Sequence, residues 1–320
     1  MLLASSSHRR LGQDEGDFLS MEHGQYERFV CHISWNHCCI DMFFNTSPDA
    51  LNIPRSTIDP VGYGKVAIVT GCSSGIGLAC TQLLLAHQYQ VCGLDTRDFS
   101  YSLLQESDHG RFHFHRADLT KPKACENGLY ASLASFGRRV DFLINVAGVM
   151  GSFSSVDSVS DDEWERVMAV NLTVPVKMMR AVLPVMKENG GGVIVNVAST
   201  AALSGAVAGI AYTCSKHGLI GATKNVAWQF RKEGIRCNAV LPGAVDSRVG
   251  EAVAAGGGES FDAKAYAQVE PVHALHAQAS GTDASIATLE VAQAILFLGT
   301  DQARPINGVS LPVDQAWCAV

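Results

Sequence analysis

Short apolar runs alternate with helix-length segments through most of this chain, and that alternation limits its fold more than any other feature. The runs are rich in β-branched residues and cover residues 66–70, 90–94, 112–116, 142–145, 193–197, 236–241 and 309–313. Parallel strands need a crossover connection, usually a helix, between one strand and the next. The pattern therefore predicts an α/β fold: a doubly wound Rossmann sheet of seven mostly parallel strands with helices on both faces.

Residues 1–62 differ from the rest, because charged residues, histidines, cysteines and turn formers are mixed there without a sustained period of 2 or 3.6. We expect a largely disordered N-terminal extension, in which Met21 or Met42 could also be the start of translation, followed by one domain over residues 63–320. Five possible zinc ligands occur in the extension: Cys31, His32, His37, Cys38 and Cys39. The paired spacing of a zinc site is absent, so we expect no metal.

Charge and composition argue against two classes of partner. The 24 basic and 31 acidic residues leave a net charge of −7, the wrong sign for binding nucleic acid or an anionic membrane. No stretch approaches the ~18 uninterrupted apolar residues of a membrane span. The ten cysteines form no CxxC pair, a pattern that fits reduced thiols and predicts a cytoplasmic protein.

A glycine-rich turn follows the first predicted strand and opens a helical segment. Glycine allows a close backbone approach, and the N-terminus of the helix offers unpaired N–H groups to a pyrophosphate. Such a turn can also be no more than a tight strand-to-helix connection. The residues expected to lie against the pyrophosphate are Gly71, Ser73, Ser74, Gly75, Ile76 and Gly77.

Asp95 ends the second strand, where an acidic residue is expected to accept the ribose hydroxyls of a dinucleotide. A carboxylate there would repel a 2′-phosphate, and Ser74 is neutral where an NADP site often places a base. Both positions favour NAD over NADP, although Arg97 lies close enough to complicate this preference. Asp118 could contact the adenine edge, or it could cap the segment that begins at Thr120.

Tyr212 and Lys216 are four residues apart on a predicted helix, thirteen and more residues after Ser199. This spacing places the ammonium and the phenol on one helix face. A phenol with a pKa near ~10 is a poor base at neutral pH, and a nearby cation lowers that pKa. The pair alone could also be an ordinary surface pair on a helix.

Several motifs occur together and in order: TGCSSGIG, NVAG at residues 145–148, then Asn171, Ser199, the Tyr212/Lys216 pair and a Pro-Gly after the sixth strand. In this combination residues 64–320 resemble the short-chain dehydrogenase/reductase family. The resemblance implies that Tyr212 is the general acid/base and that Lys216 lowers its pKa and holds the nicotinamide ribose. It implies that Ser199 hydrogen-bonds the substrate oxygen and that Asn171 holds a water in the proton relay.

The same resemblance implies the cofactor, NAD, with NADP less expected, and a set of residues that bind it. The family commonly has Thr where Ser247 stands. The set comprises Gly71, Ser73, Ser74, Gly75, Ile76, Gly77, Asp95, Asp118, Leu119, Asn145, Ala147, Gly148, Tyr212, Lys216, Pro242, Gly243, Val245 and Ser247.

Asn171 also has a physical argument of its own. Residues 160–163 have the pattern of a capping box, in which Ser160 and Glu163 cap the start of a helix reciprocally. Pro175 lies four residues after Asn171 and has no N–H, so the carbonyl of Asn171 loses its helical partner. The sequence predicts a bend there and a carbonyl that can bind water, although the bend could also only follow the curvature of the sheet.

Residues 248–287 match no motif, and we interpret residues 246–287 as a substrate lid. His273 and His276 could touch substrate there, but we expect them on a solvent-facing helix. Near the C-terminus, residues 315 and 316 are Gln and Ala where the family usually has two glycines.

The expected function is an NAD-dependent oxidoreductase that interconverts a secondary alcohol and a ketone through Tyr212. Its partner would be a small-molecule alcohol or ketone, and the resemblance implies a homodimer or homotetramer. Two alternatives stay open. One is an NADP-dependent ketone reductase of secondary metabolism, and the other is a catalytically idle, nucleotide-binding scaffold protein.

Overall fold

The computed structural model of the chain describes residues 59–245, 261–280 and 286–319. Residues 1–58 of the expected extension therefore lie outside the described residues. So do Ser247, two segments of the expected lid, 246–260 and 281–285, and the side chain of His276.

Seven strands form one sheet, as the sequence predicts, and every strand pair in it is parallel. The strand order is β3-β2-β1-β4-β5-β6-β7, so the order reverses between β1 and β4. Ligands bind at such a switch point, outside the carboxyl ends of the strands. The strands are β1 (Val66–Thr70), β2 (Gln90–Asp95), β3 (Phe112–Arg116), β4 (Phe142–Asn145), β5 (Gly192–Val197), β6 (Ile235–Pro242) and β7 (Ser310–Val313).

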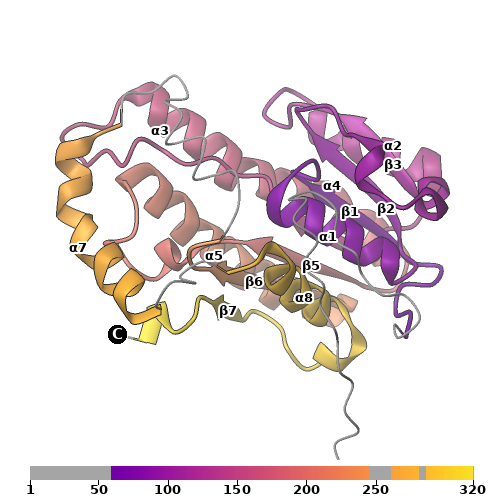
Figure 1. The fold of residues 1–320 in the computed structure, drawn as a ribbon. Helices are drawn as coiled ribbons and strands as arrows, with labels where there is room; N and C mark the ends of the chain where they lie inside the picture. Colours follow the sequence, from indigo (N-terminus) through magenta and orange to yellow (C-terminus); the bar gives the residue numbers. More distant parts are fainter. Residues whose placement is uncertain (1–58, 246–260, 281–285, 320) are drawn as a thin grey trace, which may run out of the picture. The chain divides into compact units, whose positions relative to one another are not determined.

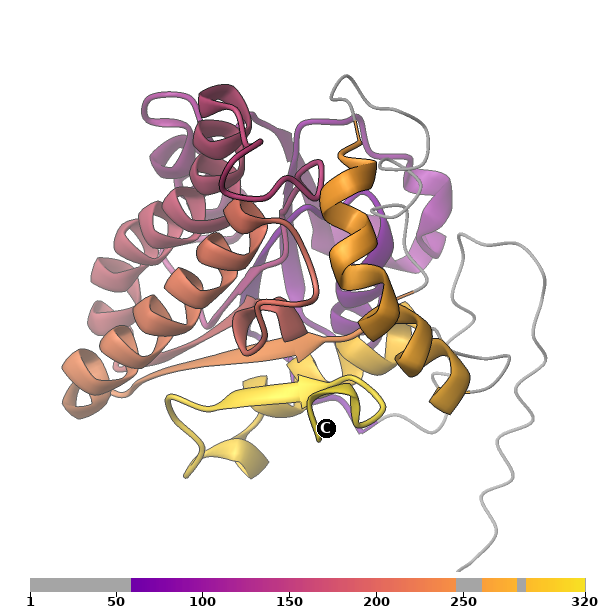
Figure 2. The ribbon, with the colours of Figure 1, turned by 90° about the vertical axis from the view of Figure 1, so that its left-hand side faces the viewer.

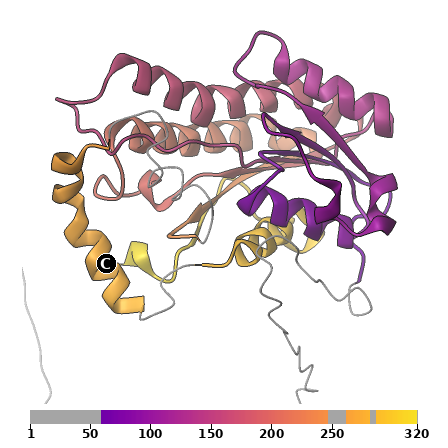
Figure 3. The same cartoon turned by 45° about the horizontal axis from the view of Figure 1, so that its top comes forward.

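Helices cover both faces of the sheet (Figures 1 and 3). On one face α1 (Gly75–Ala86) packs against α8 (Thr288–Gly299). The other face carries α2 (Ala124–Phe136), α4 (Val174–Glu188) and α5 (Ile210–Phe230), with α3 (Asp161–Met168) leading into α4. This arrangement confirms the doubly wound fold.

The helix α7 (Ala263–Ser280) lies apart from both helical layers (Figures 1 and 2). The amide of Asp262, just before α7, donates to the carbonyl of Ser152 in the segment after β4. His273 of α7 contacts Trp317 in the segment after β7, 5.4 Å between ring centroids. These contacts place α7 beside the segments that follow the carboxyl ends of two strands.

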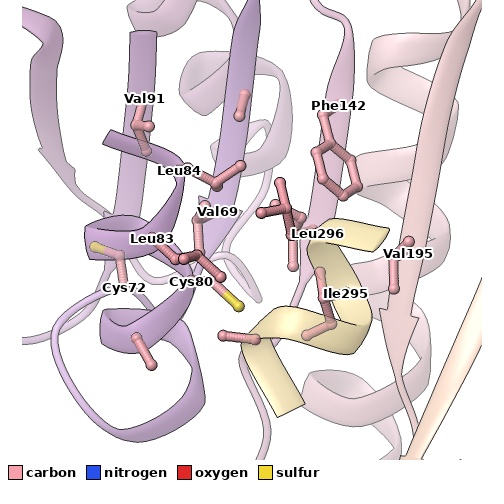
Figure 4. Packing of buried hydrophobic residues seen from close by; sticks show 14 of the residues in the cluster. Val69, Cys72, Cys80, Leu83, Leu84, Val91, Phe142, Val195, Ile295 and Leu296 are labelled. Carbon is pink, nitrogen blue, oxygen red and sulfur yellow. The ribbon is translucent and has the colours of Figure 1, made fainter. Parts of the chain in front are cut away.

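Two apolar clusters fill the space between the sheet and its helices, and successive residues of a strand contribute to opposite clusters. In β1, Ala67 and Val69 belong to the cluster under α1 and α8, and Ile68 belongs to the cluster under α2 and α4. Figure 4 shows the first cluster, in which Leu84 and Leu296 come from the two helices. Because both faces of the inner strands β1 and β4 are buried, these strands are nearly uninterrupted apolar runs, which is why the sequence indicates them so clearly. The edge strands β3 and β7 are only partly buried.

The irregularity expected at Asn171 is a π-helical segment, Ala169–Thr173, between α3 and α4. Pro175 follows it near the start of α4, and its missing N–H removes the regular helical partner of the Asn171 carbonyl. A π-helical turn is a common response to such a defect and often marks a functional site. Asn171 itself is fully buried.

The expected capping box at the start of α3 forms only by half. Ser160 Oγ accepts a hydrogen bond from the amide of Glu163, 3.1 Å, as predicted. The carboxylate of Glu163 turns away, however, and accepts from the amide of Ser152 and the hydroxyl of Ser154, each at 2.7 Å. The reciprocal half of the prediction is therefore wrong, because two donors from a distant segment outcompete the local amide.

One helical stretch of the described residues, Asp161–Glu188, is long and apolar enough to cross a membrane by length and composition alone. Its second part, α4, buries Met178, Val182 and Met186 in the cluster against the sheet. A core helix passes the same test of length and hydropathy, and this packing accounts for the apolar residues that α4 buries, whereas Trp164 and Val176 of the same stretch are exposed.

Candidate functional site

A cleft of about 780 Å³ runs along the carboxyl ends of the strands, lined by the connections that follow them. Its walls come from the segments after β1 to β6, from α5 and α7, and from the segment after β7. Most of the predicted site residues line it: Gly71, Ser74, Gly75, Ile76, Asp95, Asp118, Leu119, Ala147, Gly148, Ser199, Tyr212, Lys216, Pro242, Gly243 and Val245. Ser73, Gly77, Asn145 and Asn171 do not line it, and Ser247 lies outside the described residues.

The glycine turn after β1 has a conformation and a close approach that favour glycine. Gly71 has a φ of +72°, and a Cβ on Gly77 would lie 2.0 Å from the carbonyl oxygen of Gly71. Ser74 is the N-cap of α1, but its side chain makes no capping hydrogen bond. Ser74 therefore leaves the first amides of α1 uncapped at the floor of the cleft, an arrangement that suits an anionic group.

Asp95 ends β2 with its carboxylate held by two main-chain amides. Oδ2 accepts from Ser73 N and Oδ1 accepts from Arg97 N, each at 3.0 Å. The side chain of Arg97 bends back over the glycine turn, where its guanidinium donates to Ser74 Oγ and lies 3.9 Å from Asp95 Oδ1. An acidic and a basic group thus lie together at the position where the sequence predicts the contact with a ribose.

Asp118 lines the cleft and also caps a turn, so both predicted roles remain compatible with its position. Its Oδ1 accepts from the amide and the hydroxyl of Thr120, at 3.0 and 2.6 Å. These hydrogen bonds, that of the hydroxyl most of all, lower the pKa of Asp118. The helix α2 begins only at Ala124, so the capped segment is a turn and not the helix itself.

Tyr212 and Lys216 lie one turn apart on α5, and Ser199 follows the end of β5. Lys216 Nζ is 5.4 Å from the centroid of the Tyr212 ring and donates to the carbonyl of Val197, 3.0 Å. Ser199 Oγ accepts from the amide of Ala201 at 3.1 Å. The structure therefore brings the three predicted catalytic side chains to one end of the cleft.

The expected lowering of the Tyr212 pKa does not occur in the protein alone. Burial of the hydroxyl raises the pKa of Tyr212, and a hydrogen bond with Ser199 only partly opposes this effect. Burial also lowers the pKa of Lys216 to about 8. The prediction is wrong for the free protein because desolvation disfavours both charged forms, the phenolate and the ammonium.

Asn171 is brought near the site through its side chain. Its Oδ1 accepts from Val149 N at 2.8 Å, and its Nδ2 donates to Val149 O at 2.9 Å and to Ser215 Oγ at 3.2 Å. Asn171 therefore fixes the segment after β4 against α5. Gly148 lies in between, and a Cβ there would be 3.6 Å from Lys216 Nζ.

Two polar residues that the sequence analysis did not single out hold the same segment. Thr70 Oγ1 accepts from the amides of Val146 and Ala147, at 3.0 and 3.1 Å. Asn196 accepts from Asn145 Nδ2 at 2.8 Å, and the buried Oδ1 of Asn145 has no partner among the described residues. Thr70, Asn145 and Asn196 each lie at or next to the carboxyl end of a strand, and that shared position is the signal that could have identified them.

His273 is not on a solvent-facing surface, and that expectation is wrong. Its Nε2 lies 2.9 Å from the carbonyl of Val207, and the residue lines the cleft. The ring contacts Phe153 and Trp317, with centroid distances of 6.2 and 5.4 Å. The contacts of His273 reach residues more than forty positions away, which a local pattern does not reveal.

The segment after β7 adds a wall that the sequence analysis did not predict. Gln315 and Ala316 have φ angles of +49° and +67°, the left-handed region that glycine prefers. Asp314 accepts from the amides of Ala316 and Cys318, and this turn carries the buried Trp317 into the cleft wall. Two residues other than glycine therefore adopt a conformation that glycine prefers, at the positions where the family usually has two glycines.

Comparison with known proteins agrees with this geometry. The family model for short chain dehydrogenases matches residues 65–256. The chain is 45% identical to the short-chain dehydrogenase/reductase cdmF of Talaromyces verruculosus over 255 residues, which cover 80% of this chain and 97% of that one. It is also 45% identical to the asnovolin H dehydrogenase nvfC of Aspergillus novofumigatus over 259 residues, 81% of this chain and 98% of the relative.

Two solved structures are similar as a whole. A putative short-chain dehydrogenase/reductase from Burkholderia xenovorans has a TM-score of 0.71 at 28% identity, covering 82% of this chain and 99% of the other. Levodione reductase has a TM-score of 0.68 at 25% identity, covering 81% of this chain and 99% of the other.

Proposed function

The chain belongs to the short-chain dehydrogenase family, and from that premise we propose that it is an NAD-dependent oxidoreductase that interconverts a secondary alcohol and a ketone. The observation that carries this proposal is the convergence of Ser199, Tyr212 and Lys216 on the cleft that begins at the glycine turn. The partner is a small-molecule alcohol or ketone.

The residues of the cleft suit a dinucleotide. The uncapped start of α1 and the close approach of Gly77 to Gly71 leave room for a pyrophosphate. Asp95 would accept the ribose hydroxyls, and the unpartnered Oδ1 of Asn145 lies at the end of β4, at the switch point of the sheet. When bound, the dinucleotide supplies the hydride acceptor or donor for the carbon that carries the substrate oxygen.

Tyr212 exchanges the proton of the substrate oxygen in this mechanism. In the oxidative direction the phenolic oxygen takes the proton from the alcohol, and in the reductive direction it returns one. Ser199 donates a hydrogen bond to the same oxygen and stabilises the charge that develops on it. Lys216 in its charged form favours the phenolate of Tyr212, and this effect opposes the burial that raises the Tyr212 pKa.

Asn171 contributes to the proton relay without touching the substrate. Its side chain already bonds to Val149 and Ser215, and we assign its part in the relay to its main-chain carbonyl, which Pro175 deprives of the regular helical donor. A water held by this carbonyl near Lys216 would connect the site to solvent.

A second candidate is an NADP-dependent ketone reductase, and Arg97 favours it. The guanidinium beside Ser74 could pair with a 2′-phosphate, whereas the carboxylate of Asp95 repels one. We place NAD first because Asp95 is buried and held by two amides, whereas the side chain of Arg97 is 57% exposed. The idle-scaffold alternative has less support, since none of the four catalytic residues is replaced.

Two further proposals concern the protein as a whole. We propose a homodimer or homotetramer, because Trp164 of α3, Val176 of α4 and Trp228 of α5 are exposed apolar side chains on helices of one layer. We also propose a cytoplasmic location, which the free thiols among the described residues fit, five of them buried.

The experiment that tests the function is a panel of secondary alcohols with NAD and NADP, and of ketones with the reduced cofactors, followed by the absorbance of the reduced nicotinamide. We expect turnover of at least one secondary alcohol, with kcat/KM higher for NAD than for NADP. Loss of all turnover in the Tyr212→Phe variant assigns the activity to this site. A wild-type protein that binds NAD but converts no member of the panel would instead support the alternative of a catalytically idle scaffold protein.

A further inference from the structure

One wall of the cleft is made of aromatic rings from three separate parts of the chain. Phe153 follows β4, His273 lies on α7 and Trp317 follows β7, and all three line the cleft. Phe153 also contacts Tyr266 and Phe261, with ring centroids 5.1 and 5.7 Å apart. We call Phe153, His273 and Trp317 the aromatic wall.

The aromatic wall adjoins the catalytic end of the cleft. Trp317 belongs to a small apolar cluster with Ala201 and Val207, against which Tyr212 and Met150 pack. Nε2 of His273 is already engaged by the carbonyl of Val207, so the wall presents mainly ring faces and edges. A small alcohol bound at Tyr212 would leave this apolar surface in contact with water, whereas a ring system attached to the carbinol carbon would cover it.

Phe153 has an unfavourable backbone conformation, which contacts with the surrounding chain must stabilise. Its φ is +63°, in the left-handed region that side chains other than glycine rarely adopt. Its main chain is enclosed by the start of α5, because a Cβ on Gly209 would lie 2.7 Å from the carbonyl carbon of Phe153. The amide of Ile210 donates to the carbonyl of Ser154 at 2.9 Å.

The carboxylate of Glu163, on α3, holds the turn that carries Phe153. This buried carboxylate accepts from the amide of Ser152 and from the hydroxyl of Ser154, the two neighbours of Phe153. The turn passes so close that a Cβ on Gly151 would lie 2.2 Å from Glu163 Oε1. The carbonyl of Ser152 in turn accepts a hydrogen bond from the amide of Asp262, just before α7. One carboxylate thus fixes a turn that touches α3, α5 and α7.

We propose that the aromatic wall is the subsite for the apolar body of the substrate and that Glu163 is the positioning residue that holds it in shape. The substrate class is an alcohol or ketone whose reacting carbon belongs to, or carries, a bulky fused-ring hydrocarbon. This inference rests on the proposed function, because that function places the reacting oxygen at Tyr212.

The test measures binding without turnover. The full-length protein, saturated with NAD, is titrated calorimetrically with 2-decalone and with cyclohexanone, which NAD cannot oxidise. The second ring of 2-decalone adds four carbons of apolar surface, and their partial burial should make wild-type binding at least about tenfold tighter than that of cyclohexanone. The readout is the ratio of the two dissociation constants.

Two variants and one control address the two parts of the proposal. Phe153→Gly removes the ring at a φ that glycine tolerates, and we expect the ratio to fall to about threefold or less. Glu163→Gln keeps the volume, but an amide NH₂ cannot accept the second hydrogen bond, and we expect a similar fall. Glu165→Gln changes an exposed glutamate on the same helix and should leave the ratio at its wild-type value.

The possible results test the subsite and the positioning role of Glu163 separately. Equal binding of the two ketones by the wild type, or an unchanged ratio in Phe153→Gly, overturns the subsite. An unchanged ratio in a folded Glu163→Gln overturns the positioning role alone. If Glu163→Gln does not fold, Glu163→Asp is used, since its shorter carboxylate cannot span both donors. A protein that prefers 2-decalone but turns over no alcohol keeps the subsite and refutes the proposed function, so the two failures are distinguishable.

Discussion

Lys216 Nζ donates a 3.0 Å hydrogen bond to the carbonyl of Val197, the last residue of β5, and both residues are buried. This bond ties the catalytic helix α5 to the end of the strand that leads to Ser199. Because the partner is a neutral carbonyl and not a carboxylate, it does not offset the cost of burying a charge. The pKa of Lys216 is accordingly lowered to about 8.

This lowered pKa predicts a pH-dependent stability. A lysine whose pKa falls from 10.5 to about 8 on folding opposes folding fully below pH 8 and ceases to do so above 10.5. The free energy of unfolding of the wild type relative to Lys216→Met should therefore rise between pH 8 and 10.5, by on the order of 3 kcal/mol in total. Urea unfolding of both proteins without cofactor at pH 7.5 and 10 measures this. A difference that stays constant with pH would show that folding does not lower the pKa of Lys216.

Tyr212→Phe should reduce turnover by about 10²–10⁴-fold, because it removes the group that exchanges the proton. The dissociation constant for NAD should stay within a few-fold of wild type, since only one hydroxyl is lost. Stopped-flow absorbance gives the rate, and quenching of tryptophan fluorescence gives the affinity. Tyr130→Phe, at an exposed position of α2, is the matched control and should behave as wild type.

Much of the fold and the site could be predicted because the relevant signals are local. Strands buried on both faces appear as apolar runs, and the glycine turn, Tyr212 and Lys216 are read from neighbouring positions in the sequence. The function of each such residue depends on its type and on a short spacing. The order of the motifs along the chain then suffices to indicate which loops meet at the carboxyl ends of the strands.

The remaining features depend on contacts between distant segments. The carboxylate of Glu163 serves Ser152 and Ser154 and not its own helix, and His273 finds its partners at positions 153, 207 and 317. The pKa of Tyr212 rises because of burial, a property of the packed protein that the spacing to Lys216 does not contain. Helical spacing in the sequence predicts which side chains are close together, but it does not predict how far burial desolvates them.

Asp95→Ala should weaken the preference for NAD. Loss of the carboxylate removes an acceptor for the ribose hydroxyls and the repulsion of a 2′-phosphate, while Arg97 remains beside Ser74. We expect the ratio of kcat/KM for NAD to that for NADP to fall by about tenfold or more. Steady-state rates with both cofactors measure it. Asp98→Ala, three residues further on and exposed, is the control, and an unchanged ratio in Asp95→Ala would falsify the assignment.

Arg97→Ala tests the opposite group. If Arg97 is the contact for a 2′-phosphate, this variant should lose about tenfold or more in kcat/KM with NADP and little with NAD. Equal losses with the two cofactors would instead mean that Arg97 acts by holding Ser74 and the glycine turn in place. The same steady-state comparison distinguishes these results.

Gly77→Ala should abolish tight NAD binding. The added Cβ would stand 2.0 Å from the carbonyl oxygen of Gly71, so the turn must open to accommodate it. We expect the dissociation constant to rise by at least about tenfold, together with a loss of stability of about 1–3 kcal/mol from the strain. Fluorescence titration and urea unfolding measure the two effects. Gly110→Ala, where no atom outside the neighbouring backbone lies within 4 Å of the added carbon, should leave the dissociation constant unchanged and should not destabilise the protein.

Ala316→Gly should stabilise the protein. Ala316 has a φ of +67° in the turn after β7, where its amide donates to Asp314 Oδ1 at 3.1 Å. The left-handed conformation costs alanine about 1–2 kcal/mol, and glycine gives back only part of this through its larger unfolded-state entropy. We expect the free energy of unfolding to increase by about 0.5–1 kcal/mol. Ala206→Gly, at a residue with an ordinary negative φ, should decrease it by a similar amount, so urea unfolding of both variants gives opposite signs if the strain at Ala316 is real.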